Sequence, residues 1–297
     1  MMNFLSLLIN GISLGSMYAL IALGYTMVYG IAKMLNFAHG EVIMIGGIAT
    51  YEILAAAHLN AYVAIIIAIV VCTILGVVVE KVAYKPLRRA GSLAVLITAI
   101  GVSYFLQNIA LLTFGASDKS YTIQELQFDW RINSELSIHG TTIINVVVMV
   151  VIMVALTIFI KYTKMGRSMM AVSEDKDAAQ LMGINVNGVI SVTFAIGSAL
   201  AGIAGFLFLG KYSRIGAYSG TMPGIKAFTA AVFGGIGSIP GAMLGGISLG
   251  IIEQFSRSVL TDLQLSNLTD AVVFLILIAV LLIKPTGILG KKIVEKV

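Results

Sequence analysis

Long uninterrupted apolar runs are the feature that most constrains how this chain can fold. Examples are the stretches at 61–80 and 268–283, and several more runs approach 20 residues. A transmembrane helix needs about 20 apolar residues. Backbone groups in hydrocarbon must be satisfied within the protein, and the runs lack the alternation of a membrane barrel strand. The sequence therefore predicts an all-α polytopic membrane protein.

Composition and the N-terminus support this interpretation. The chain is 59% hydrophobic and 11% charged, against about 45–50% and 25% in soluble domains. The first apolar run lacks a basic leader and is too long for a signal peptide, so it is interpreted as the first span. We expect one transmembrane domain over 1–297 with eight to ten helices. The candidate spans are 4–31, 36–57, 61–80, 92–114, 141–160, 187–209, 223–239, 240–257 and 268–283.

The basic residues indicate how the chain is oriented. Thirteen of the 19 lysines and arginines fall in alternate connections: Lys33, Lys81, Lys85, Arg88, Arg89, Lys161, Lys164, Arg167, Lys176, Lys284, Lys291, Lys292 and Lys296. Cytoplasmic loops carry the excess of positive charge. The loop at 161–186 and the C-terminus are thus predicted to be cytoplasmic. The loop at 115–140, which holds the only tryptophan, is predicted to be external, as either a solvated hairpin or a docking surface for an external protein.

The cytoplasmic loop contains a short polar segment, AVSEDKDAAQLMGINVN at 171–187, that predicts a helix outside the bilayer. Ser173 is a suitable N-cap, because its hydroxyl can accept from the free amides of the first turn. The helix spans about 174–182 and ends at Gly183, the residue type that commonly follows a helix. Negative charge near the positive end of the helix dipole is favourable. The acidic residues placed there are Glu174, Asp175 and Asp177.

One face of this helix is apolar, with Ala178, Leu181 and Met182 at i, i+3 and i+4 spacing. A loop that only joined two spans could be much shorter. The helix therefore predicts a cytoplasmic partner that packs against it.

Two interruptions break apolar stretches, MLNFAHGEV at 34–42 and FGGIGSIPGAM at 233–243. Corresponding breaks in two halves of a transporter point to repeats that flank a translocation path. We predict a path at 36–41 and 234–240, with tight packing as the alternative. The residues assigned to this path are Asn36, His39, Glu41, Gly234, Gly235, Gly237 and Ser238.

Several function classes lack the residues that they need. The chain has no phosphate-binding loop and no His-Glu-x-x-His helix, and its three histidines and the lone Cys72 are scattered. It is therefore expected to be no enzyme, to bind no metal or cofactor, and to bind no nucleic acid. The acidic residues near span ends are expected to reach water, which leaves little for ion coupling; they are Glu52, Glu80, Glu253 and Asp270.

Four stretches carry a resemblance to a known family. LNFAHGEV, AVSEDKDAAQLMGINV, GIKAFTAAVFGGIGSIPGAMLGG and KPTGILG occur in this order over nearly the whole chain. The chain resembles the membrane permeases of branched-chain amino acid ABC importers, the LivH type. Permeases for urea and short amides share much of the pattern, and usually have a longer N-terminal region that this chain lacks.

The resemblance implies a type II importer permease in a bacterial inner or plasma membrane. Its implied partners are a second permease of the LivM type, two cytoplasmic ATPases that bind ATP and Mg²⁺, and an external protein that delivers leucine, isoleucine or valine. Transport would be inward, by alternating access. The segment at 174–182 would be the coupling helix, with small Ala178 and Ala179 against an ATPase. A permease for urea or amides, and a stand-alone secondary transporter, are the alternatives.

Overall fold

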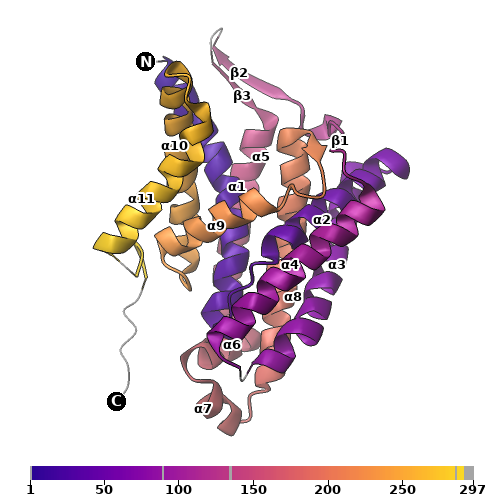
Figure 1. Ribbon diagram of the computed structural model, residues 1–297, viewed down its shortest axis with the longest axis vertical. Helices are drawn as coiled ribbons and strands as arrows, with labels where there is room; N and C mark the ends of the chain where they lie inside the picture. The colour runs from indigo at the N-terminus through magenta and orange to yellow at the C-terminus, as the bar shows by residue number, and fades with distance from the viewer. Residues whose placement is uncertain (1, 89, 134–135, 285, 291–297) are drawn as a thin grey trace.

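The structure is a computed structural model that describes residues 2–88, 90–133, 136–284 and 286–290 (Figure 1). The basic residues Arg89, Lys291, Lys292 and Lys296 and the C-terminus lie outside the described residues. The helices are α1 (Met2–Ala32), α2 (His39–Tyr51), α3 (Ala61–Val79), α4 (Ser92–Phe114), α5 (Gly140–Tyr162), α6 (Lys164–Glu174), α7 (Lys176–Leu181), α8 (Val186–Tyr212), α9 (Thr221–Gly234), α10 (Ile239–Asp262) and α11 (Thr269–Ile283).

Short elements extend or join these helices. Turns of π-helix continue α2 over Glu52–Ala56 and α3 over Glu80–Tyr84, and 3₁₀ turns cover Lys85–Leu87, Gln124–Leu126 and Ser266–Leu268. The strands are β1 (Lys119–Ser120), β2 (Asp129–Asn133), β3 (Leu136–His139) and β4 (Arg214–Ile215). Strands β2 and β3 form an antiparallel hairpin, and β1 pairs with β4 just after α8.

Six helical segments in the described part of the chain are long and apolar enough to cross a membrane. They are Phe4–Ala32, Ala61–Leu87, Ser92–Phe114, Gly140–Tyr162, Val186–Tyr212 and Ser266–Ile283. The prediction of an all-α polytopic membrane protein is confirmed. Helix α2 has only 13 residues and α9 only 14, while α10 has 24 but carries charged side chains.

The predicted span at 223–239 needs a correction. Helix α9 ends at Gly234 and α10 begins at Ile239, so the last residues of that span form a turn between two helices. Likewise, the predicted span at 36–57 starts with three residues outside α2, which begins at His39.

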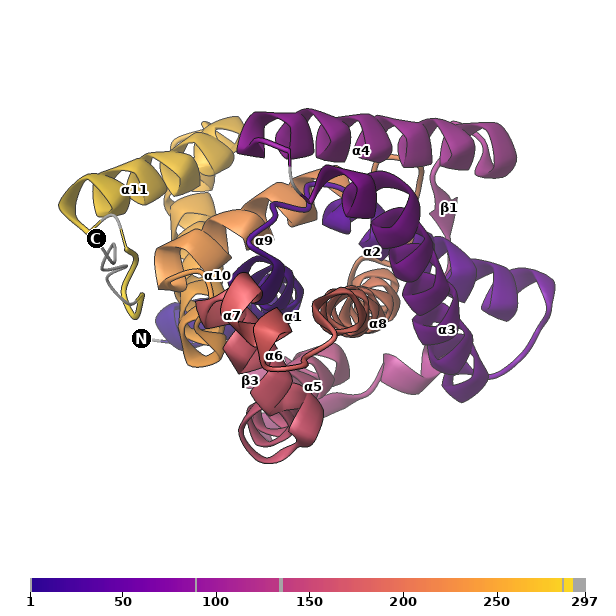
Figure 2. The ribbon, with the colours of Figure 1, turned by 90° about the horizontal axis from the view of Figure 1, so that it is seen from below.

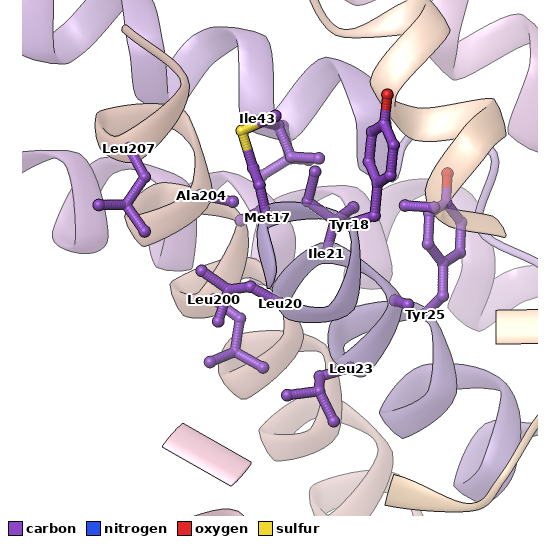
Figure 3. Close-up of a cluster of buried hydrophobic side chains, with 14 of the residues drawn as sticks. Met17, Tyr18, Leu20, Ile21, Leu23, Tyr25, Ile43, Leu200, Ala204 and Leu207 are labelled. Atoms are coloured by element: carbon purple, nitrogen blue, oxygen red, sulfur yellow. The ribbon is translucent and has the colours of Figure 1, made fainter. Parts of the chain in front are cut away.

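Helices α1 and α8 form the centre of the molecule, and the other helices surround them (Figure 2). Most residues of α8 are buried within the chain, whereas only Thr269 and Val273 are buried in α11. Figure 3 shows Met17, Leu20 and Ile21 of α1 with Leu200 and Leu207 of α8 in the core that this packing forms. The outer helices expose apolar side chains, as a protein surrounded by lipid requires.

Glycines allow the helices to approach closely. A Cβ atom added to Gly250 of α10 would lie 2.2 Å from the Gly15 amide nitrogen of α1. A Cβ atom added to Gly205 of α8 would lie 2.5 Å from the Gly47 nitrogen of α2. Without a hydrophobic drive between helices in lipid, such close backbone contact stabilises association.

The two ends of the molecule differ in character. The start of α1 and the β2–β3 hairpin lie at one end, and α6 and α7 lie at the other (Figure 1). The loop at 115–140 and the loop at 161–186 are therefore on opposite sides, as the charge pattern requires. Which side faces the cytoplasm stays a prediction.

Candidate coupling helix and translocation path

A helix is present in the predicted coupling segment but is shorter than expected, and its coupling role stays a prediction. Helix α7 has six residues, and its N-cap is Asp175, whose side chain accepts from the amides of Asp177 and Ala178 at 2.9 Å each. The prediction that Ser173 is the cap is wrong. Ser173 and Glu174 end the preceding helix α6, and the Ser173 hydroxyl donates to the Met170 carbonyl at 2.7 Å. Asp175 separates α6 from α7, because its backbone is extended, with φ of −155°.

Helix α7 presents apolar side chains to its surroundings. Leu181 is 88% exposed and Met182 is 83% exposed. Gly183 follows with φ of +83°, the left-handed conformation expected at the end of a helix. Ala178 is exposed as well, but Ala179 is buried within the chain, so Ala179 packs internally and does not face a partner.

Lys176, the first residue of α7, connects this helix to the centre of the molecule. Its Nζ donates to the carbonyl oxygen of Ala32 at 2.7 Å. Ala32 is the last residue of α1, where helix carbonyls lack partners and a cation is favourable. Burial, together with the charges of Arg88 and Lys33, lowers the pKa of Lys176. The ammonium is thus held in a partly desolvated position at the start of the first interruption.

A second polar cluster lies at the same end. The Arg88 guanidinium contacts the Glu80 carboxylate and the side-chain oxygen of Asn187, and Ser191 donates to Glu80 at 2.7 Å. Glu80 is fully buried, so the expectation that it reaches water is wrong. The burial is tolerable because Glu80 is both paired and hydrogen-bonded. The contacts join the end of α3 to the start of α8.

The first interruption is held by side chains from two helices. Asn36 is buried and its Oδ1 accepts from the Tyr84 hydroxyl at 2.8 Å. His39 is also buried, and its ring meets Tyr25 edge-on with centroids 4.7 Å apart. The Nε2 atom of His39 has no hydrogen-bond partner in the described structure.

Glu41 faces a different group of polar side chains. Its Oε1 accepts from Gln107 at 2.8 Å, and from Ser103 and Thr221 at 3.2 Å each. Its Oε2 is buried without a partner among the described residues. Glu41 therefore links the start of α2 to α4 and α9, and an unsatisfied buried oxygen of this kind calls for a further partner.

The second interruption is a packed turn. Gly235 and Gly237 have φ of +105° and +95°, and Ser238 caps α10 by accepting from the Gly241 amide at 3.2 Å. The backbone at 288–289 donates to the carbonyls of Phe233 and Gly234 at 2.9 Å. Gly234 and Gly235 are buried against backbone, so they serve packing in this conformation, the alternative left open by the sequence.

The two interruptions meet. Asn36 of the first and Ile236 of the second line one cavity together with Tyr25, Tyr29 and Phe228. The cavity measures about 10 Å³, close to the least volume that holds one water molecule. The cavity therefore has room for about one water molecule. The assignment of path residues stays a prediction.

Sequence reasoning missed a buried ionic network that joins four helices. Lys226 of α9 lies 2.8 Å from Glu253 of α10 and 2.7 Å from Asp270 of α11, measured between the charged atoms. Arg257 and Tyr18 also contact Glu253, each at 2.9 Å. Glu253 is buried, so the expectation that it reaches water is wrong. The signal in the sequence was Lys226, a lone cation inside an apolar stretch.

The described residues contain no group of three or more histidine, cysteine or acidic side chains that could hold a metal ion. Cys72 is buried and donates to the Val42 carbonyl at 3.3 Å, which makes it a packing residue.

The six apolar segments long enough to cross a bilayer define a multi-pass membrane protein. The family model described as the permease component of branched-chain amino acid transport systems matches residues 7–281. This chain belongs to that family, and the resemblance to LivH-type permeases is confirmed. It is a permease component of a multi-subunit transport system, and the prediction that it is not itself an enzyme is confirmed by this membership.

Full-length relatives agree with the family. The high-affinity branched-chain amino acid transport system permease protein LivH of Salmonella typhimurium is 47% identical over 306 residues, which cover 99% of this chain and 98% of that protein. BraD of Pseudomonas aeruginosa, a permease protein with the same description, is 45% identical over 308 residues with the same coverage. Among solved structures, PsaBC from Streptococcus pneumoniae in complex with Fab gives a TM-score of 0.44 at 15% identity over 97% of this chain and 91% of that one, a likeness too low to carry a conclusion.

Proposed function

We propose that this chain is a permease subunit of an ATP-driven ABC importer for leucine, isoleucine and valine. It works in a bacterial inner or plasma membrane, with the C-terminus in the cytoplasm. Its partners are a second permease of the LivM type, two cytoplasmic ATPases that bind ATP and Mg²⁺, and an external substrate-binding protein. The substrate class is proposed from the full-length relatives, whose names specify branched-chain amino acids.

The observation that carries the proposal is the position of α7. Leu181 and Met182 are exposed on a capped helix beyond the membrane spans, while Lys176 of the same helix is hydrogen-bonded to the end of α1. A partner that binds the exposed side of α7 can therefore move α1, the central helix to which α7 is hydrogen-bonded. The first interruption follows Ala32 immediately, so a movement of α7 reaches Asn36 through four residues of chain.

In this proposal, ATP-driven closure of the ATPases moves α7, and the permease pair opens outward beneath the external binding protein. The path residues are those of the two interruptions, with Asn36 and Ile236 lining the small cavity where the interruptions meet. The chain itself supplies no catalytic group. Its residues position the helices and exclude water until the pair opens.

The test is reconstitution. The chain is expressed with candidate second permease and ATPase subunits, purified in mild detergent, and placed in liposomes with the external binding protein. ATP-dependent uptake of radiolabelled leucine, isoleucine and valine supports the proposal. Uptake of urea or acetamide in place of these amino acids contradicts the substrate assignment, and leucine uptake by the chain alone contradicts the ATP-driven mechanism.

A further inference from the structure

A second, larger cleft lies away from the two interruptions, at the opposite end of the molecule from α7. It measures about 330 Å³ and lies between the π-helical turn that follows α2, the end of α4 and strand β1. Small-molecule sites in proteins measure roughly 300–1,000 Å³, so this cleft is large enough for one small ligand. It is lined by Tyr51, Glu52, Ala55, Ala56, Thr113, Phe114 and Lys119.

Two opposite charges face this cleft without neutralising one another. Glu52 and Lys119 both line it, and both are exposed. Neither belongs to any of the ion pairs found within 4.0 Å in the described part of the chain. A simple anion would be repelled by Glu52 and a simple cation by Lys119. A ligand that carries one charge of each sign satisfies both groups.

The wall beside these charges is aromatic. The rings of Tyr51 and Phe114 meet edge-on with centroids 5.5 Å apart, and the Lys119 Nζ lies 5.9 Å from the Phe114 centroid. Ala55 and Ala56 add small apolar surface. The exposed lining as a whole is mostly polar, so recognition of a ligand rests on the two charged groups more than on this apolar wall.

One of the two π-helical turns in the described part of the chain lies at this cleft; the other covers Glu80–Tyr84. Glu52 begins a turn of π-helix, with the Ala57 amide donating to the Glu52 carbonyl at 3.0 Å. Such turns are rare and are frequently found at functional sites. The turn directly continues α2, whose first residues are His39 and Glu41. One continuous helical segment thus joins this cleft to the first interruption.

We propose that this cleft is a binding site for a zwitterionic amino acid on the external side, with Lys119 holding the carboxylate and Glu52 the ammonium group. The inference rests on the proposed function, because that function supplies the side on which the cleft lies and the substrate class. It adds a site on the permease itself, where the amino acid binds after it leaves the external protein.

The experiment measures binding of tritiated leucine to the purified full-length chain in phosphatidylglycerol nanodiscs, whose headgroups carry no ammonium. Saturable binding is expected, and Glu52→Gln and Lys119→Met are each expected to weaken it at least tenfold, or about 1.4 kcal/mol. Glu125→Gln and Arg131→Met remove like charges from exposed positions on the same loop outside the cleft and are the matched controls. Leucinamide, which lacks the carboxylate, should compete poorly in the wild type but as well as leucine in Lys119→Met.

Leucine binding that is unchanged in both cleft variants overturns the proposal. A lipid headgroup is the rival occupant, because phosphatidylethanolamine also carries an ammonium and an anion. If phosphatidylethanolamine abolishes leucine binding and stabilises the wild type against heat but not Glu52→Gln, the site belongs to lipid and the proposal is wrong. Failure here is distinct from failure of the proposed function: wild-type uptake by reconstituted Glu52→Gln and Lys119→Met transporters would reject the cleft and leave the importer assignment intact.

Discussion

The ammonium of Lys176 donates a hydrogen bond to the Ala32 carbonyl oxygen at 2.7 Å, and these two residues are 144 positions apart. The contact places the first residue of the exposed helix α7 on the last residue of the central helix α1. It gives a physical basis for coupling, since a displaced α7 must either carry the end of α1 with it or break the bond.

Lys176→Met tests this connection. The variant retains a side chain of similar length but loses the donor, and hydrogen bonds to charged groups contribute about 1.5–3 kcal/mol. We expect ATP-driven uptake to fall at least fivefold while the ATPase subunits still co-purify and hydrolyse ATP. Lys164→Met, on the neighbouring helix α6, is the control. Equal loss of uptake and of ATPase binding would show that Lys176 is needed only for assembly.

Gly183→Leu should uncouple transport from hydrolysis. Gly183 has φ of +83° with open space around a Cβ atom, so the change introduces backbone strain and no clash. The left-handed conformation costs a residue with a side chain roughly 1–2 kcal/mol. Gly183→Asn is the matched control, because asparagine adopts this conformation more readily. Uptake relative to ATP hydrolysed is the measurement, and identical ratios in both variants would contradict the role of the α7 terminus.

Lys226→Met should destabilise the membrane domain. Breaking a buried ion pair costs about 3–5 kcal/mol when it leaves a charge without a partner. Arg257 and Tyr18 still contact Glu253 in the variant, so we expect a smaller loss of stability. The expected result is a lower midpoint of thermal unfolding in detergent. The double variant Lys226→Met with Glu253→Gln should recover part of the loss, since the buried charge is then gone. Asp270→Asn should cost less, because Asp270 is partly exposed. A double variant as unstable as the single one would show that packing, and not charge, sets the effect.

Single cysteines test the orientation of the chain. Glu125→Cys in the 115–140 loop should react with an impermeant thiol reagent added outside intact cells, and Asp177→Cys in α7 should react only after the membrane is opened. Native Cys72 is buried and should stay silent in both cases. The reverse pattern would overturn the assignment of the two sides and, with it, the cytoplasmic role of α7.

Local sequence predicted the short helix of the candidate coupling segment. The helix near 174–182 and its glycine end are encoded by cap and dipole preferences within a few residues, so the residues indicated a helix there. The cap was misplaced from Asp175 to Ser173 because both residue types cap helices well. Their competition is decided by where α6 ends, which depends on its packing against α5 and α8.

The sequence by itself determined that this chain crosses a membrane as helices, because the lengths of its apolar runs and the absence of water in lipid leave no other solution. It also determined the family, through motifs spread over the whole chain. Only the tertiary structure decided which charges are buried together, as in the pairing of Lys226 with Glu253, and which helices end in contact, as Lys176 does with Ala32. Such partners lie on helices far apart in the sequence. Local sequence patterns carry no information about the distance between such partners in the folded protein. Packing of the helices sets that distance.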